Sequence, residues 1–177
     1  MTDADRFEAF VREYQDMVFA TAVRLLASSA EAEDIAQTVF LRAFERFASI
    51  ATSPTAAGWL KTVTTNLCLN HLARYRARWQ FFSELDRPGD AERYESTIAA
   101  PHAGDAVEQA SRHGRLERAV RGLPDHQRVP LVLFHFEDMT YKEIAATLGI
   151  SLAKVRTDIH RGREALKREM TSSYEPD

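Results

Sequence analysis

The chain contains 177 residues, of which 45% are hydrophobic and 28% are charged, as is typical of a globular protein with one medium domain or two small ones. Its longest apolar runs are far shorter than the roughly 20 residues of a membrane-spanning helix, and the acidic N-terminal segment does not resemble a signal peptide. A single cysteine, Cys68, excludes an internal disulfide, and no Cys/His group has metal-ligand spacing. We therefore expect a cytoplasmic protein with no membrane insertion, metal or cofactor.

The net charge of −3 argues against a general nucleic-acid-binding protein, but the charges are distributed in blocks. Residues 59–80 contain four basic residues and no acid, residues 83–108 contain seven acids and two arginines, and residues 152–168 contain six basic residues and two acids. This order suggests two polyanion-binding modules that are separated by a segment that does not bind polyanions.

Helical periodicity dominates the first module, and no segment shows a convincing strand alternation. Apolar spacings of three and four predict a helix from Phe7 to Leu26, and the following SSAEAED segment predicts the cap and first turn of a second helix. One face of this second helix is predicted to enter the core and carries Ile35, Val39, Phe40, Phe44 and Phe47. The opposite face carries Asp34, Gln37, Thr38, Leu41 and Glu45.

Residues 48–58 are predicted to form a loop, and a third helix with a polar face follows. Asparagine is a mediocre helix former, but its amide can both donate to and accept from the edge of a base. Aromatic residues near the end of the helix alternate with arginines, a pattern suited to stacking on unpaired bases and holding phosphates. A solvated polar face with a basic end would explain these residues equally well. The residues concerned are Thr62, Asn66, Asn70, Arg74, Tyr75, Arg76, Arg78 and Trp79.

Proline, glycine and many charges in residues 84–106 predict a mobile linker. A second module is expected from about Val107, with an apolar helix over residues 129–136. Pro130 is expected near the start of this helix, where its missing N–H costs little.

Residues 139–170 carry the strongest signal, which is that of a helix-turn-helix. Thr140 and Glu143 form a capping box for a short helix that ends at Gly149, and Ser151 can cap a second helix two residues later. The exposed side of the second helix can reach phosphates and base edges in a major groove. It carries Lys154, Arg156, Thr157, His160, Arg161 and Arg163. A helical hairpin with a solvated basic face is the less favoured alternative.

Read together, these motifs resemble the small extracytoplasmic-function (ECF) group of the bacterial sigma-70 family. Residues 31–47, EAEDIAQTVFLRAFERF, resemble the family's polymerase-binding helix. Residues 58–78, GWLKTVTTNLCLNHLARYRAR, resemble the helix that melts the promoter and recognises the −10 element. Residues 123–170 resemble the domain that reads the −35 element.

With the periodicity, this resemblance predicts an all-α fold of two small helical domains joined by a flexible acidic linker, the second containing the helix-turn-helix. A region 2-like domain for core polymerase and the −10 element is expected over residues 1–82. The linker is expected over residues 83–106, and a region 4-like domain for the −35 element over residues 107–177.

The resemblance also implies a sigma factor that binds core RNA polymerase and promoter DNA, with no catalytic residue. The implied polymerase-binding residues are Asp34, Gln37, Thr38 and Leu41. The implied −10 contacts are Lys61, Asn66, Asn70, Arg74, Arg76 and Arg78, with Asn66 and the 48–58 loop capturing flipped bases. The implied −35 contacts are Ser151, Lys154, Arg156, Thr157, His160 and Arg161.

Three positions depart from the family's usual residues. Thr38 stands where glutamate is common, Asn70 where aspartate is common, and Asp158 where a basic residue is common. Asp158 is expected either to weaken phosphate attraction or to accept a hydrogen bond from a cytosine amino group. Phosphorylation of Thr38 by a Ser/Thr kinase would restore negative charge to the polymerase-binding face. The alternative is neutral drift at Thr38, with control by an anti-sigma factor or by expression level.

Two other classes of protein compete with a sigma factor. A stand-alone helix-turn-helix regulator would bind duplex DNA without polymerase, and it would have no use for the Asp34–Leu41 face or for Asn66. A helical enzyme is disfavoured because the six histidines are scattered and no acid/base or nucleophile constellation appears.

Overall fold

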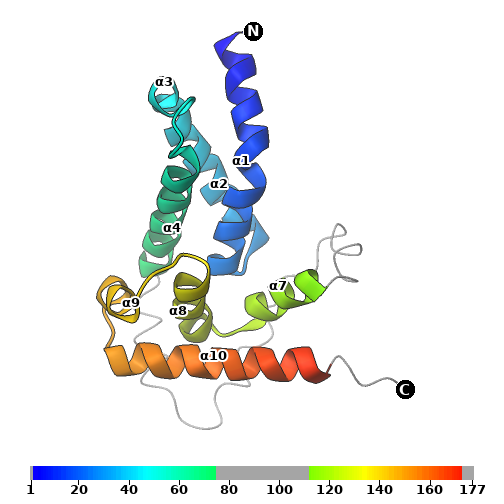
Figure 1. The fold of residues 1–177 in the computed structure, drawn as a ribbon, viewed down its shortest axis with the longest axis vertical. Helices are drawn as coiled ribbons and strands as arrows, with labels where there is room; N and C mark the ends of the chain where they lie inside the picture. The colour runs from blue at the N-terminus through cyan, green and yellow to red at the C-terminus, as the bar shows by residue number, and fades with distance from the viewer. Residues whose placement is uncertain (1, 75–111, 173–177) are drawn as a thin grey trace. The chain divides into compact units, whose positions relative to one another are not determined.

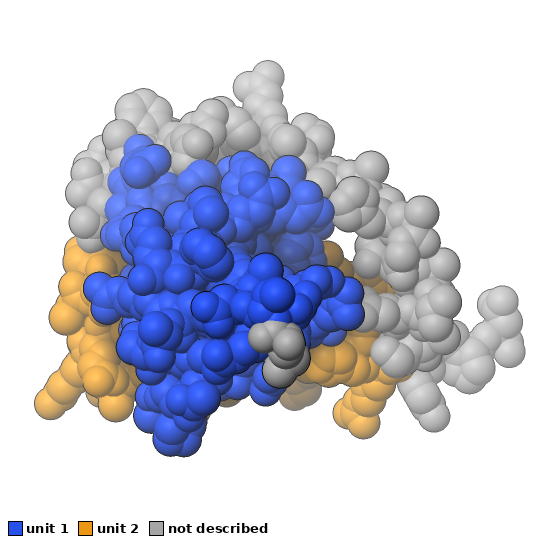
Figure 2. Space-filling model, turned by 90° about the horizontal axis from the view of Figure 1, so that it is seen from above, with its two compact units in different colours: residues 1–90 blue, residues 91–177 orange. Residues whose placement is uncertain are grey.

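The computed structural model describes residues 2–74 and 112–172, and all regular secondary structure in these two ranges is helical (Figure 1). The chain divides into two compact units, residues 1–90 and residues 91–177 (Figure 2). The predicted linker, residues 83–106, lies outside the described residues. The predicted fold class, all-α with two helical domains and a helix-turn-helix in the second, is confirmed.

Three long helices and one short helix form the described part of unit 1. They are α1 (Asp3–Leu26), α2 (Ser29–Glu45), α3 (Phe47–Ile50) and α4 (Ala56–Arg74). A capping box starts α1, since the Asp5 N–H donates to Thr2 Oγ1 at 3.2 Å and the Thr2 N–H donates to Asp5 Oδ2 at 2.7 Å. The Glu31 N–H donates to Ser28 Oγ at 3.3 Å and so caps α2, as the sequence predicts.

The core of unit 1 lies where α1, α2 and α4 pack against one another. Its fully buried side chains include Val18, Leu25, Val39, Leu60 and Cys68. Thr64 is also buried, and its hydroxyl donates to the Leu60 carbonyl at 2.7 Å, so that no polar hydrogen is left unsatisfied there.

Two predictions for unit 1 need correction. Phe44 is predicted in the core but is 59% exposed, and its ring meets that of Phe7 edge-on at 5.0 Å. The buried stripe of α2 instead consists of Ala32, Ile35, Val39 and Ala43, which places Phe44 on the flank of the helix. The segment 48–58 is not wholly a loop, because α3 ends at Ile50 and α4 begins at Ala56.

Unit 2 contains four described helices. They are α7 (Arg112–Gly122), α8 (Asp125–His135), α9 (Tyr141–Leu148) and α10 (Leu152–Ser172). The helix expected over residues 129–136 begins at Asp125, so Pro130 lies inside α8 rather than near its start. The proline has no N–H to donate to the carbonyl four residues earlier, and Pro130 itself lies in the run of buried residues from Arg128 to Leu133, whose packing offsets this loss.

The predicted helix-turn-helix is formed by α9 and α10. The Glu143 N–H donates to Thr140 Oγ1 at 3.2 Å and the Thr140 N–H donates to Glu143 Oε2 at 2.7 Å, which completes the capping box. Gly149 ends α9 in the left-handed region at φ 66°, and the Lys154 N–H donates to Ser151 Oγ at 3.1 Å. The buried residues Ile144, Val155 and Ile159 hold the two helices together.

The axis of α10 lies close to α8. A Cβ atom at Gly162 would lie 2.9 Å from Leu131 Cδ1, so glycine permits this close approach. Figure 1 shows α7 beside the C-terminal half of α10, and the two helices are in contact. The C-terminal half of α10 is therefore part of the scaffold of unit 2, whereas its first turns follow the tight turn from α9.

Candidate polymerase and DNA interfaces

The outer face of α2 combines acids, an amide and apolar side chains. Asp34 and Gln37 are exposed. Thr38 is half-buried as a residue, and its hydroxyl donates to the Asp34 carbonyl at 3.0 Å. Leu41 is 67% exposed, and Phe44 lies one turn further along. We call this surface, consisting of Asp34, Gln37, Thr38, Leu41 and Phe44, the Leu41 face.

The sequence alone does not assign Phe44 to this face. Its spacing from Phe40 and Phe47 suggests a core position. The small residues Ala32 and Ala43 are the signal that could correct this, since they continue the Ile35–Val39 stripe along α2. Two large exposed apolar side chains on one helix of a small domain are suited to contact with a partner protein.

The polar face of α4 is open to solvent. Thr62, Asn66, Asn70 and Arg74 are all exposed and follow one another at single-turn spacing. Neither Asn66 nor Asn70 makes a side-chain hydrogen bond to any described residue, so both amides are available to a ligand. Lys61 is half-buried at the edge of this face, and the predicted contacts Arg76 and Arg78 lie outside the described residues.

One polar contact joins α4 to α2. His71 Nε2 lies 3.1 Å from Glu31 Oε1, which joins the last turns of α4 to the first turn of α2. At the other end of α4, a shallow depression is lined by Arg42, Glu45, Arg46, Trp59 and Val63. The polar face of α4 is therefore presented by a helix that packs on α1 and α2 and is joined to α2 near its C-terminal end.

The first turns of α10 present most of the predicted −35 contacts. Arg156, Thr157, His160 and Arg161 are exposed on the side opposite the buried residues of the helix. The Thr157 hydroxyl donates to the Ala153 carbonyl at 3.0 Å, and Arg156 has no ion pair with another described residue. Ser151 is exposed, but its hydroxyl already serves as the cap of α10.

Asp158 corrects one expectation from the sequence. Its side chain is 3% exposed because it lies on the buried side of α10, so it cannot accept a hydrogen bond from a cytosine in a groove. Lys154 Nζ lies 2.9 Å from Asp158 Oδ2, and the Lys154 side chain is 35% exposed. Lys154 is predicted to be exposed, but it is half-buried and forms an ion pair.

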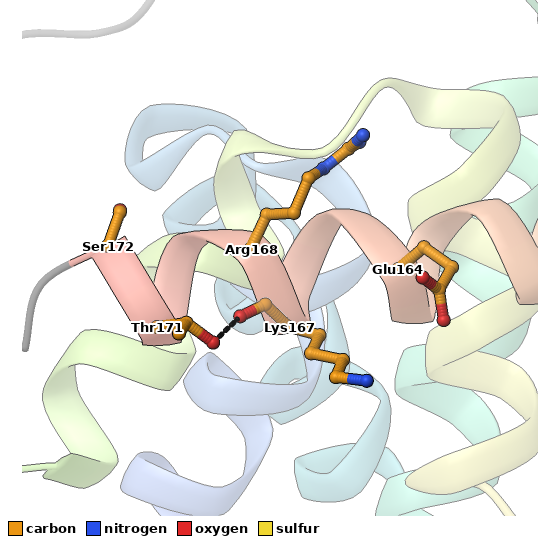
Figure 3. A pocket seen from close by; sticks show the side chains of 5 residues that line it. All are labelled: Glu164, Lys167, Arg168, Thr171 and Ser172. Carbon is orange, nitrogen blue, oxygen red and sulfur yellow. Dashed lines mark hydrogen bonds between the residues drawn. The ribbon is translucent and has the colours of Figure 1, made fainter.

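The far end of α10 offers no enclosed ligand site. Figure 3 shows the shallow depression there, lined by Glu164, Lys167, Arg168, Thr171 and Ser172. All five residues come from one helix and are exposed. Among the residues that the structure describes, no group of three or more His, Cys, Asp or Glu could hold a metal ion, and no helix is long and apolar enough to cross a membrane.

Comparison with known proteins identifies both units. The family profile described as sigma-70 region 2 matches residues 10–78, which cover most of α1 through α4. The profile described as sigma-70 region 4 matches residues 113–166, which cover most of α7 through α10. The two matches follow one another along the chain in the same order as the two helical units. The chain belongs to the sigma-70 family of RNA polymerase sigma factors.

Individual relatives narrow the family to one group. The ECF RNA polymerase sigma factor SigW of Bacillus subtilis is 30% identical over 95% of this chain and 90% of its own length. The ECF sigma factor SigE of Mycolicibacterium smegmatis is 35% identical over 91% of this chain and 60% of its own length. The chain is therefore a sigma factor of the ECF group.

A solved structure supports the fold at lower sequence identity. The sigma factor RpoE of Bartonella quintana, crystallised with the anti-sigma factor NepR, matches with a TM-score of 0.52 and 20% identity. The match covers 93% of this chain and 96% of that chain.

Proposed function

We propose that the chain binds core RNA polymerase in the cytoplasm and directs it to a promoter, without chemistry of its own. Unit 1 would bind polymerase and the −10 element, and unit 2 would read the −35 element. The observation that carries this proposal is the pairing of the exposed Leu41 face with an exposed cationic helix-turn-helix in one chain. A stand-alone DNA-binding regulator would need only the second feature.

Asp34, Gln37, Thr38 and Leu41 are the proposed polymerase contacts. Burying the exposed Leu41 side chain against a partner would contribute by desolvation, at about 25 cal/mol for each Å² of apolar surface. The neighbouring polar groups would fix the orientation of the contact. Phe44 extends the apolar area of the same face and belongs to this proposal.

The −10 element is assigned to α4. The amides of Asn66 and Asn70 can read base edges, and Arg74 at the end of the same face can hold a phosphate. Lys61, Arg76 and Arg78 remain predicted contacts of this element. Unstacking a base costs a few kcal/mol, which contacts of this kind would have to offset.

The −35 element is assigned to the first turns of α10. Arg156, Thr157, His160 and Arg161 would face the major groove as duplex contacts, with Ser151 and Lys154 at the start of the helix. The proposed domain limits are residues 1–82 and 107–177, with a linker over residues 83–106. Both profile matches fall inside these limits, which supports them.

Run-off transcription with purified core polymerase tests the proposal. Wild-type protein should give specific transcripts from genomic DNA, and Leu41→Ala should give far fewer at the same protein concentration. A gel shift without polymerase distinguishes a sigma factor from a stand-alone DNA-binding regulator. Tight sequence-specific binding by the chain alone, together with no transcripts, would identify a stand-alone regulator instead.

Two kinds of regulation are compatible with the proposed function. The structural match to an anti-sigma complex supports an anti-sigma factor as a partner. Thr38 supports control by a Ser/Thr kinase, because a phosphate there would add about −1.5 to −2 charges beside Asp34. Thr38 lies within α2 and its hydroxyl donates to a backbone carbonyl, so phosphorylation would have to break that hydrogen bond.

Comparing Thr38→Glu, Thr38→Ala and wild type distinguishes these possibilities. If modification is required, only Thr38→Glu should bind core polymerase tightly. Equal binding by all three proteins would eliminate the kinase and leave an anti-sigma factor or expression level as the control.

A further inference from the structure

The ion pair between Lys154 and Asp158 occupies the first turns of α10, where the promoter contacts are proposed. The two residues are one turn apart on the same helix, and Nζ lies 2.9 Å from Oδ2. The carboxylate end of the pair is buried, with 3% of its side chain exposed, whereas 35% of the Lys154 side chain is exposed. The pair therefore runs from the interior of unit 2 to its surface.

The buried oxygen Oδ2 of Asp158 has Lys154 as its charge partner. Among the described residues no group donates a well-aligned hydrogen bond to this buried oxygen, and Lys154 is the cation that reaches it. A buried charge without a partner is strongly unfavourable, because the low-dielectric interior does not replace the water it has lost. Moving the Lys154 ammonium to a DNA phosphate would leave Asp158 in that state. Lys154 should consequently stay in place when DNA binds.

We propose that Asp158 is a positioning residue that fixes Lys154, and that Lys154 thereby determines base specificity at one position of the −35 duplex. A lysine is normally a flexible point charge that suits phosphates at many positions. Here Asp158 holds the ammonium at one position, and 35% of the Lys154 side chain is exposed. An ammonium has three N–H donors, so those not directed at Asp158 remain for an acceptor on DNA. The base-edge groups that such a donor recognises are acceptors, above all O6 and N7 of guanine.

Arg156 provides the contrast on the same helix. It is exposed and has no ion pair within the described residues, so it can follow a phosphate wherever the backbone lies. The inference rests on the proposed −35 role of α10. It adds that Asp158, which does not contact DNA, determines that Lys154 and not Arg156 discriminates between bases.

The test is a selection with complete holoenzyme, assembled from this chain and core polymerase, on duplex promoters with a randomised −35 element. Wild type is compared with Asp158→Asn, Lys154→Met and the matched control Arg156→Met. Asp158→Asn and Lys154→Met should both lose about tenfold of discrimination at the same base position, within the range of a single good base contact. Arg156→Met should weaken binding of all sequences to a similar extent.

Coupling gives a second readout. The double variant Asp158→Asn/Lys154→Met should discriminate between bases no worse than either single variant, because each single variant already removes the same base contact. Lys154→Met keeps the carboxylate and Asp158→Asn keeps the lysine, so a folding defect in one variant leaves the other informative.

Three results would overturn the inference. Asp158→Asn could retain the wild-type base preference with uniformly weaker binding, which would indicate a purely structural role. Alternatively, the two single variants could lose discrimination at different positions, which would separate the two residues. If wild-type holoenzyme enriches no −35 sequence at all, the proposed function of α10 fails and the inference with it.

Discussion

Arg163 donates a hydrogen bond from Nε to Nε2 of His135 at 3.1 Å, and this bond joins α10 to the end of α8. The acceptor nitrogen must be unprotonated for the bond to exist. Partial burial, and then the charge of Arg163, lower the pKa of His135 from its usual value of 6.5. The same guanidinium lies over the ring of Phe134, with 5.4 Å from Cζ to the ring centroid.

We expect unit 2 to lose stability in mild acid. The folded pKa of His135 lies below the unfolded value, so its contribution to stability is complete above the unfolded pKa and is lost as the pH falls through the folded pKa. Chemical unfolding between about pH 7.5 and about pH 5 should show the decline. His135→Gln cannot titrate and should flatten it, and an unchanged slope in His135→Gln would show that another group is responsible.

The capping box of α9 gives a second prediction. Thr140→Ala removes the oxygen that accepts from the Glu143 N–H and should lower the free energy of unfolding by about 1 kcal/mol. Thr147→Ala is the matched control, because Thr147 is exposed on the same helix and caps nothing. Urea unfolding of both variants measures the difference, and equal losses would contradict a specific role for the cap.

Glu143 adds a pH dependence of its own. Its hydrogen bonds with the backbone and the hydroxyl of Thr140 lower the pKa of the carboxyl below 4.5. Because the folded pKa is depressed, the benefit is present above the unfolded pKa and disappears as the pH falls through the folded one. Glu143→Gln should therefore be less stable than wild type near neutral pH, with the gap closing in acid. A gap that persists unchanged to low pH would rule out the charged capping interaction.

Gly162 should resist replacement. Alanine is favoured over glycine in a helix by about 1 kcal/mol, but overpacking a core costs about 1–3 kcal/mol. Leu131 is 2% exposed and would meet the new Cβ at 2.9 Å, so we expect Gly162→Ala to be destabilising overall. Gly122→Ala on α7 is the control, since nothing lies within 4 Å of its added Cβ, and it should be neutral or stabilising.

A double variant checks the cause. Adding Leu131→Val to Gly162→Ala should cost less than the sum of the two single effects, because the shorter side chain relieves the clash. Additive losses would point to a different origin for the destabilisation.

The apolar part of the Leu41 face should matter for partner binding and little for folding. Leu41→Ala should change the free energy of unfolding by no more than about 0.5 kcal/mol, since the side chain is 67% exposed. It should weaken binding to core polymerase by about tenfold or more. Leu60→Ala is the opposite case, a fully buried residue whose loss should cost about 2–5 kcal/mol. Normal polymerase affinity in Leu41→Ala would exclude this face as the docking surface.

The sequence is sufficient to predict features with local causes. Thr140, Gly149 and Ser151 act through hydrogen bonds and backbone angles within a few residues, so their spacing along the chain is enough to indicate the helix-turn-helix. The amide face of α4 follows from helical spacing alone and is exposed as predicted. The roles of these faces in binding stay predictions until they are tested.

Features that depend on packing between helices cannot be predicted in the same way. Whether Phe44 or Ala43 enters the core depends on the rotation of α2 against α1 and α4, which differs by one residue between the two cases. Asp158 resembles a surface acid in the sequence because no local pattern reveals what lies beneath α10. Its spacing of four from Lys154 is nevertheless a visible sign of an ion pair.

The length of α10 has a consequence for how such proteins diversify. Its 21 residues extend about 31 Å, so one continuous helix carries both the proposed DNA contacts and the part that packs on α7 and α8. Substitutions in the first two turns need not disturb Gly162 or Arg163 further along. Paralogues descended from one ancestor could therefore acquire new target sequences through a few changes at one end of a helix, while inheriting an unaltered fold from the other.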